Sequence, residues 1–157
     1  MRKKVLFVCL GNICRSPAAE GVMKHLLHQA QLEDHVFVDS CGTSAHHEGE
    51  EADPRMQKHA EDRGYKITSI ARGFRKADFE EFDYIITMDE SNYNNLVSLD
   101  RKGHFREKIA KMTDFCESIE APSVPDPYYG GPDGFEEVLD ILEDACDGFL
   151  KKIKKEL

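Results

Sequence analysis

Two kinds of hydrophobic pattern alternate along the chain. Short apolar runs with β-branched and aromatic members are typical of buried strands, and they predict strands at residues 4–8, 35–39, 82–88 and 108–112. Elsewhere apolar residues recur every three or four positions, which is typical of a helix with one buried face. The chain is accordingly predicted to be helical at residues 17–31, 54–63, 90–97 and 135–153.

Residues with capping preferences set the expected ends of these helices. Ser16 followed by Pro17 predicts an N-cap and a first helical position, and Glu20 is expected to place a negative charge in the first turn. Gly64 is expected to end the second helix, and Asp89 to cap the third. The first helix is thus expected to begin directly behind the loop that follows the first strand.

Strands that alternate with helices predict an α/β fold, with a parallel sheet and helices on both faces. A chain of 157 residues can bury one core, so residues 1–157 are expected to form a single domain. Ligands of such sheets bind at the carboxyl ends of the strands. Cys9, Ser40, Asp89 and the loop around Asp126 follow predicted strands or nearby segments, and we expect them to meet at one edge.

Composition and charge narrow the class of protein. Hydrophobic residues make up 40% of the chain, and no apolar run approaches the ~20 residues that cross a bilayer. The formal net charge of −9 argues against a nucleic-acid partner, which requires a basic surface. The five cysteines lack the pattern of a secreted disulfide protein, and no signal peptide is expected, so the predicted location is the cytoplasm.

The loop after the first strand carries the most specific chemistry. It reads Cys-Leu-Gly-Asn-Ile-Cys-Arg-Ser-Pro from Cys9 to Pro17, so a thiol, a guanidinium and a helix N-terminus surround one short loop. Backbone N–H groups at a helix start are unpaired and form a nest for anions. Gly11 permits a tight bend, and Asn12 tolerates left-handed dihedral angles. This combination predicts a site for a tetrahedral dianion.

Within this loop Cys9 is the expected nucleophile. A helix N-terminus and a neighbouring cation both favour the thiolate form of a cysteine, and the Ser16 hydroxyl is expected to stabilise it further. Arg15 offers a planar fork that grips two phosphate oxygens at once. Cys14 has two interpretations: a partner that forms a protective disulfide with Cys9 on oxidation, or a small packing residue.

Residues 9–17 resemble the signature loop of the low-molecular-weight protein tyrosine phosphatases, and residues 124–131, Val-Pro-Asp-Pro-Tyr-Tyr-Gly-Gly, resemble the acid loop of that family. The similarity continues through residues 42–45, 52–56 and 82–89. The resemblance implies a three-layer α/β/α fold with a four-stranded parallel sheet in the order 2-1-3-4. It also implies hydrolysis of phosphotyrosine and aryl phosphates through a cysteinyl-phosphate intermediate.

Asp126 is the candidate general acid and base of this reaction, because the departing phenolate needs a proton and two prolines stiffen the loop around Asp126. The alternative is a simple turn. Tyr128 and Tyr129 suit an aryl ester, and His46 is a further candidate for the lip of the pocket. The remaining candidates for contact with the phosphate or substrate are Leu10, Gly11, Asn12, Ile13, Cys14 and Ser16.

Several polar residues are candidates for supporting roles. Ser40 and Asp89 are expected to support the site, and Asp89 has two compatible roles, orienting other site residues or capping a helix. The family often has a histidine that supports the loop asparagine, and Ser69 stands at that position here, so the support of Asn12 is open. Arg72 is expected to be exposed, as is Arg75, and neither is assigned a catalytic role.

Three rival functions share parts of this pattern. Arsenate reductases on the same scaffold need resolving cysteines after the third strand, and residues 88–92 contain none. Arginine phosphatases of the family typically carry threonine at the position of Ile13, and an isoleucine favours an aryl substrate. A non-catalytic phosphotyrosine-binding module would need neither Cys9 nor Asp126.

The sequence predicts few other partners. No cofactor is implied, and no metal, because His25 and His28 lack a third ligand and no zinc motif occurs. The expected substrates are phosphotyrosine-containing proteins, and the product is inorganic phosphate. We expect no nucleic acid or membrane partner, and a monomer or weak dimer.

Overall fold

The computed structural model describes residues 2–127 and 131–157. Its centre is a four-stranded parallel sheet in the order β2-β1-β3-β4, which confirms the predicted α/β fold and strand order. The strands are β1 (Lys3–Cys9), β2 (Val36–Gly42), β3 (Tyr84–Thr87) and β4 (Ile109–Lys111). The helices are α1 (Arg15–Gln29), α2 (Pro54–Asp62), α3 (Ala77–Glu81), α4 (Glu90–Leu99) and α5 (Pro132–Lys154), with short 3-10 helices at Arg106–Lys108 and Met112–Phe115.

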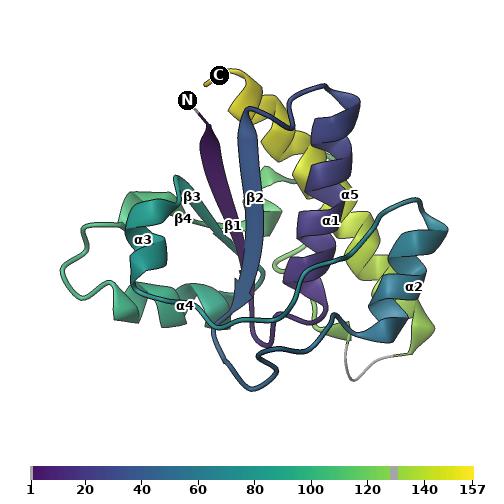
Figure 1. The fold of residues 1–157 in the computed structure, drawn as a ribbon, viewed down its shortest axis with the longest axis horizontal. Coiled ribbons are helices and arrows are strands. Elements are labelled where there is room, and N and C mark those ends of the chain that lie inside the picture. Colours follow the sequence, from purple (N-terminus) through teal and green to yellow (C-terminus); the bar gives the residue numbers. More distant parts are fainter. Residues whose placement is uncertain (1, 128–130) are drawn as a thin grey trace.

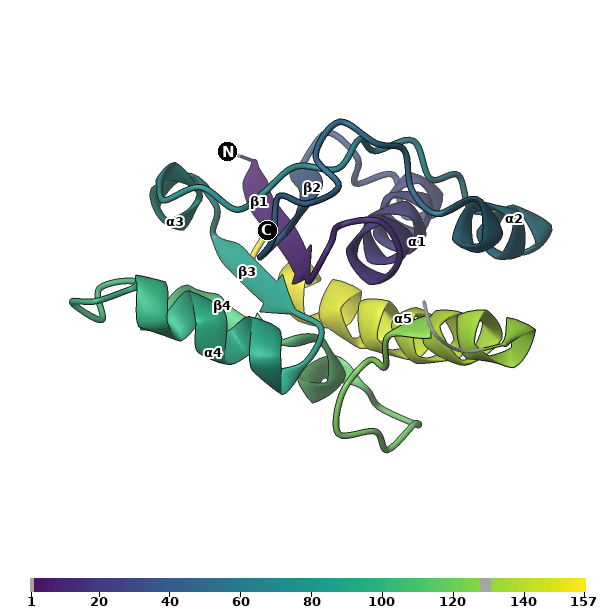
Figure 2. The same cartoon turned by 90° about the horizontal axis from the view of Figure 1, so that it is seen from below.

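Helices cover both faces of the sheet, with α1, α2 and α5 on one side and α3 and α4 on the other (Figures 1 and 2). The side chains of β1 alternate between the two cores that result. Val5 and Phe7 pack with residues of α1 and α5, whereas Leu6 and Val8 pack with residues of α3 and α4. A strand buried on both faces is apolar throughout, which is why its sequence predicted it well.

The ends of several elements differ from the prediction. β2 continues to Gly42 because it pairs with β1 along its whole length, with Gly42 opposite Cys9. Ser40 therefore lies within β2 and not in the loop behind it. β3 and β4 are shorter than predicted, and α3 was not predicted.

The start of α1 contradicts the prediction that Ser16 is its N-cap. The helix begins at Arg15, and Cys14 occupies the N-cap position without a side-chain capping bond. The Ser16 hydroxyl is engaged elsewhere, 3.0 Å from the sulfur of Cys9. Glu20 consequently lies in the second turn of α1, so it does not supply the first-turn charge that was expected.

Arg72 is not exposed as predicted. Its guanidinium donates to Asp78 at 3.0 Å and to Asp39 of β2 at 3.1 Å. These two carboxylates compensate its charge, so the side chain is held against the edge of the sheet. Arg75 is exposed, in agreement with the prediction. Arg72 thus fastens the segment after α2 to the carboxyl end of β2.

The 23-residue helix α5 is amphipathic, as its sequence predicted. Its buried side chains belong to the same core as those of α1 and one face of β1. Within residues 2–127 and 131–157, no helix combines the length and the apolar character that a membrane span requires.

Candidate active site

The loop between β1 and α1 surrounds the sulfur of Cys9. Asn12 has a φ of 59°, which confirms the left-handed conformation expected at this position. Its backbone N–H donates to the Cys9 Sγ at 3.3 Å, and the Ser16 Oγ lies 3.0 Å from the same atom. Cys9 is only 2% exposed, so the loop holds its sulfur in a nearly enclosed position.

The start of α1 provides unpaired backbone donors beside this sulfur. Arg15 and Ser16 are the first two residues of α1, so their N–H groups have no acceptor within the helix. Nor does any described residue accept a hydrogen bond from the N–H of Gly11, Ile13 or Cys14. Unpaired amides at the positive end of a helix dipole form a site for an anion.

Arg15 is buried and surrounded by negative charge. Its Nη1 donates to the Asp89 Oδ2 at 2.7 Å and to the carbonyl oxygen of Val124 at 3.1 Å, and its Nη2 lies 3.6 Å from the Asp126 Oδ2. Burial alone would lower the pKa of Arg15, but the neighbouring charges of Cys9, Asp89 and Asp126 raise it. The guanidinium is therefore a permanent positive charge at the floor of the site.

Asp89 both contacts Arg15 and caps α4. Its Oδ1 accepts a hydrogen bond from the backbone N–H of Asn92 at 2.8 Å, and the Asn92 side chain accepts one from the Asp89 N–H at 3.2 Å. The predicted cap is confirmed. The same side chain thus ties the start of α4 to the guanidinium of Arg15.

Three hydrogen bonds hold the side chain of Asn12. Its Nδ2 donates to the Ser16 Oγ at 2.8 Å and to the Ser40 Oγ at 3.0 Å, and its Oδ1 accepts from the backbone N–H of Arg72 at 3.0 Å. Ser69 does not take part, because its buried hydroxyl has no hydrogen-bond partner among the described residues. Ser40 and the Arg72 backbone therefore provide the support that the sequence left open.

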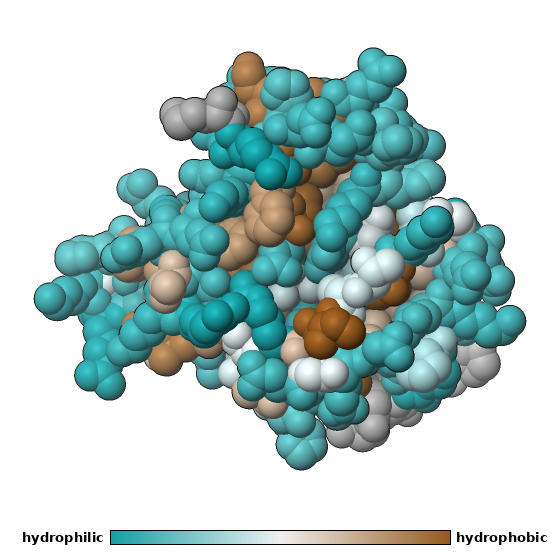
Figure 3. All heavy atoms as spheres, viewed as in Figure 1, coloured by the Kyte–Doolittle hydropathy of each residue, from teal (hydrophilic) through white to brown (hydrophobic). Residues whose placement is uncertain are grey.

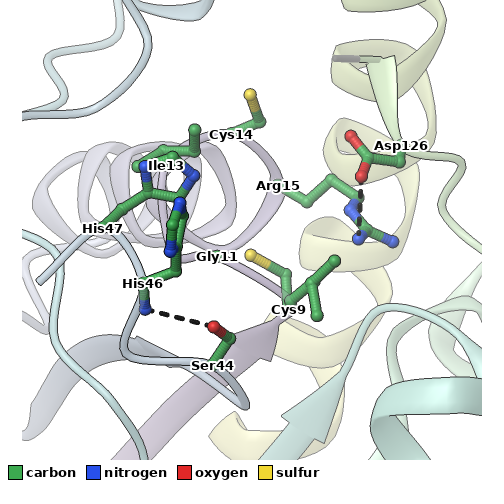
Figure 4. Close-up of a pocket in the computed structure, with 10 residues that line it drawn as sticks. Cys9, Gly11, Ile13, Cys14, Arg15, Ser44, His46, His47 and Asp126 are labelled. Carbon is green, nitrogen blue, oxygen red and sulfur yellow. Dashed lines mark hydrogen bonds and ion pairs between the residues drawn. The ribbon is translucent and has the colours of Figure 1, made fainter. Parts of the chain in front are cut away.

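The loop that carries Asp126 is anchored next to Arg15. The Val124 N–H donates to the carbonyl oxygen of Met88, just after β3, at 2.8 Å, and the Val124 carbonyl oxygen accepts from Arg15. The Asp126 side chain is 34% exposed and points toward the Arg15 guanidinium (Figure 4). The segment before Asp126 is thus fixed both to the residue that follows β3 and to Arg15.

Cys9, Arg15 and Asp126 line one pocket of about 360 Å³, a volume that suits a small ligand (Figure 4). Leu10 and His46 are exposed at its lip, and Tyr128 and Tyr129 lie outside the described residues. In the part of the chain that the structure describes, no group of three side chains could hold a metal ion. The pocket is lined by Cys9, Leu10, Gly11, Ile13, Cys14, Arg15, Ser44, His46, His47 and Asp126.

The sequence did not identify Ser44 and His47 as pocket residues, nor the constraint on Gly42. A Cβ on Gly11 would lie 2.9 Å from the His47 Cδ2, so the imidazole packs directly on the loop of residues 9–16, named the phosphate loop below for its expected ligand. A Cβ on Gly42 would lie 2.6 Å from the carbonyl oxygen of Leu10, so only glycine fits where β2 passes under that loop. For Ser44 and His47, the position shortly after the second strand was the available signal.

Cys14 also borders the pocket, but its environment differs from that of Cys9. Both are free thiols, and in Figure 4 the sulfur of Cys14 points away from that of Cys9. Burial, with the nearby charge of Asp53, raises the pKa of Cys14 far above its ordinary value. The Cys14 side chain packs in the buried core, and its two interpretations, packing residue or disulfide partner of Cys9, both stay open.

The family model described as low molecular weight phosphotyrosine protein phosphatase matches residues 4–157. A Schizosaccharomyces pombe protein with that name is 42% identical over 151 residues, which are 96% of each chain.

Solved structures give the same result. A protein tyrosine phosphatase from Entamoeba histolytica, crystallised with Hepes in the active site, is 51% identical, covers 98% of both chains and has a TM-score of 0.94. A Drosophila arginine phosphatase is 34% identical, covers 96% of this chain and 98% of its own, and has a TM-score of 0.89. The chain belongs to the low molecular weight phosphotyrosine protein phosphatase family.

Proposed function

We propose that this protein hydrolyses phosphotyrosine monoesters through a covalent phosphate ester of Cys9. One observation supports this above all: the Cys9 sulfur, the start of α1 and the Arg15 guanidinium border a single pocket, and Asp126 lines it too. A phosphate held by the unpaired amides would have its phosphorus in front of the sulfur. Nucleophile, anion site and proton donor are then all within one cavity.

In the first step, the Cys9 thiolate attacks phosphorus, and an S–P bond forms as the P–O bond to the phenol breaks. Arg15 and the loop amides stabilise the negative charge on the equatorial oxygens, most strongly in the transition state. Asp126 donates a proton to the departing phenolate oxygen. A bound phosphate would take the Arg15 donor that lies 3.6 Å from the Asp126 Oδ2, so the carboxyl group lies next to the reacting ester.

In the second step, a water molecule attacks the phosphorus of the intermediate. Asp126, now a carboxylate, accepts a proton from that water, and the S–P bond breaks to regenerate the thiolate. Inorganic phosphate then leaves. The cycle needs no group beyond the side chains and backbone of the chain and a water molecule.

The lip of the pocket supports an aryl substrate. Leu10 is 51% exposed there, and the partly buried side chain of Ile13 also lines the pocket. Apolar side chains suit the flat face of a phenyl ring better than the polar guanidinium of phosphoarginine. We accordingly place phosphotyrosine proteins first among the substrates, in the cytoplasm, with the enzyme a monomer or weak dimer.

A panel of three matched peptides, carrying phosphotyrosine, phosphoserine or phosphoarginine, tests this proposal. We expect rapid release of phosphate from the phosphotyrosine peptide alone. Cys9→Ser should abolish turnover while the protein still binds inorganic phosphate, because the amides and Arg15 remain. Full activity of Cys9→Ser would contradict the mechanism, and a preference for phosphoarginine would contradict the substrate.

A further inference from the structure

The proposed mechanism does not use Glu20, a buried carboxylate behind the phosphate loop. Glu20 is 5% exposed, on the second turn of α1. Its two oxygens have different partners: Oε1 accepts a hydrogen bond from the Ser40 hydroxyl at 2.7 Å, and Oε2 accepts one from the half-exposed Lys24 ammonium at 2.5 Å. A charge so deeply buried is costly unless it is paired, so both contacts matter.

The contact with Ser40 fixes the direction of a chain of hydrogen bonds. A carboxylate only accepts, so the Ser40 hydroxyl must donate its single proton to Glu20. Its oxygen is then free to accept from the Asn12 Nδ2 at 3.0 Å. The amide of Asn12 can therefore take only one orientation, with Nδ2 toward Ser40 and Oδ1 toward the Arg72 N–H.

The same direction continues to the nucleophile. The second N–H of the Asn12 amide donates to the Ser16 Oγ at 2.8 Å. Ser16 thereby keeps its own proton for another acceptor, either the Cys9 Sγ at 3.0 Å or the carbonyl oxygen of Cys41 at 3.2 Å. Glu20 is thus linked to the reactive sulfur through Ser40, Asn12 and Ser16.

We infer that Glu20 is a positioning residue, which holds the Asn12 amide and hence the left-handed turn of the phosphate loop through its hydrogen bond from Ser40. The inference rests on the proposed function of that loop. It assigns this role to the Oε1 contact and not to the ion pair with Lys24. The buried Ser69 hydroxyl, which has no partner in the described chain, offers Asn12 no alternative support.

Variants made in a Lys24→Met background separate the two contacts. Lys24→Met alone removes the ion pair and should bind vanadate, a phosphate analogue, within about 2-fold of wild type. Adding Glu20→Leu removes the acceptor of the Ser40 hydrogen bond but keeps a side chain of similar size. It should weaken vanadate binding and lower kcat/KM for a phosphotyrosine peptide, each by about 10-fold or more. Glu20→Gln in the same background restores an acceptor oxygen for Ser40. The amide nitrogen of the glutamine then faces no ammonium, because Lys24 is absent. This variant should recover most of the vanadate affinity and most of kcat/KM.

A stability control separates positioning from folding. Leu142→Ala removes a buried side chain of α5 and should lower the melting temperature without a comparable loss of vanadate affinity. If Glu20→Leu does not fold, Ser40→Ala breaks the same link and should show the same loss. The inference is overturned if Glu20→Leu, or Ser40→Ala in its place, loses no more vanadate affinity than Leu142→Ala does. It is also overturned if Glu20→Gln restores neither vanadate affinity nor kcat/KM. Failure of the wild-type protein to hydrolyse phosphotyrosine would instead overturn the proposed function.

Discussion

At the scale of single residues, two carboxylates share the guanidinium of Arg15 unequally. The Asp89 Oδ2 accepts a hydrogen bond at 2.7 Å, and Asp89 is itself fixed as the cap of α4. The Asp126 Oδ2 lies farther away, at 3.6 Å, on a side chain that is 34% exposed. Asp89 therefore holds the guanidinium more tightly than Asp126 does, in keeping with the proposed role of Asp126 as the acid.

Asp126→Ala should lower kcat/KM by ~10²–10⁴-fold for a phenyl ester, because the poor leaving group departs without a proton in the first step. The loss should shrink for p-nitrophenyl phosphate, whose leaving group needs less help. The measurement is kcat/KM across a series of aryl phosphates of graded phenol acidity. Asp133→Ala, an exposed carboxylate in the first turn of α5, is the matched control and should behave like wild type. An equal loss across the series would contradict the acid role.

At the scale of elements, α2 connects the phosphate loop to α5. The backbone N–H of Asp53, the N-cap of α2, donates to the carbonyl oxygen of Ile13 at 2.8 Å. Beyond the other end of α2, Arg63 donates to Glu136 of α5 at 2.6 Å, and His59 also pairs with that carboxylate. Hydrogen bonds from Arg63 and His59 lower the pKa of Glu136 below its ordinary value of 4.5.

Glu136→Gln should therefore lower the melting temperature at pH 7 by about 1–4 °C, since this partly exposed network is worth about 0.5–1 kcal/mol. A carboxylate with a lowered pKa stabilises the fold above its unfolded pKa, and the effect is lost as pH falls through the folded value. The difference from wild type should thus shrink below about pH 4.5. Thermal unfolding from pH 3 to 7 measures this difference in melting temperature, with Glu137→Gln, at an exposed position, as the control. A difference that does not change with pH would contradict the assigned role of the Glu136 charge.

The sequence predicted the elements best where burial dictates composition. The sequence predicted β1 correctly because both faces of this strand are covered and its residues are therefore apolar throughout. It predicted Asp89 as a helix cap because capping depends on residues that are neighbours in the sequence. The five-residue helix α3 is too short for a periodic pattern to reveal. The true end of β2 depends on pairing with β1, a contact between segments about 30 residues apart.

The same division holds for the site. Cys9, Arg15 and Asp126 lie in two segments with distinctive residue order, so their candidacy could be read directly. The contact of His47 with the phosphate loop and the ion pairs of Arg72 depend on tertiary packing. No local pattern in one sequence encodes such contacts.

At the scale of the whole molecule, the phosphate site opposes the overall charge. The formal net charge is −9, and the face in Figure 3 is largely hydrophilic. The positive charge of the site is a buried guanidinium and a helix terminus. At long range, the molecule therefore repels the dianion that the pocket attracts at short range.

Raising NaCl from about 10 to about 150 mM should consequently increase kcat/KM for an acidic phosphotyrosine peptide, on the order of 2- to 10-fold. The Debye length falls from about 30 Å to about 8 Å over this range, so repulsion is screened while the buried Arg15 is not. A peptide with basic flanks should show the opposite trend. A decrease for the acidic peptide would contradict the dominance of net charge.

Covalent capture of the phosphate tests the central claim most directly. Asp126→Ala with p-nitrophenyl phosphate should form the intermediate, since this leaving group needs little acid help, but hydrolyse it slowly for lack of a base. Acid quenching and peptide mass mapping should find the phosphate on Cys9. Phosphate on another residue such as His46 or His47, or none on any residue during turnover, would contradict the account.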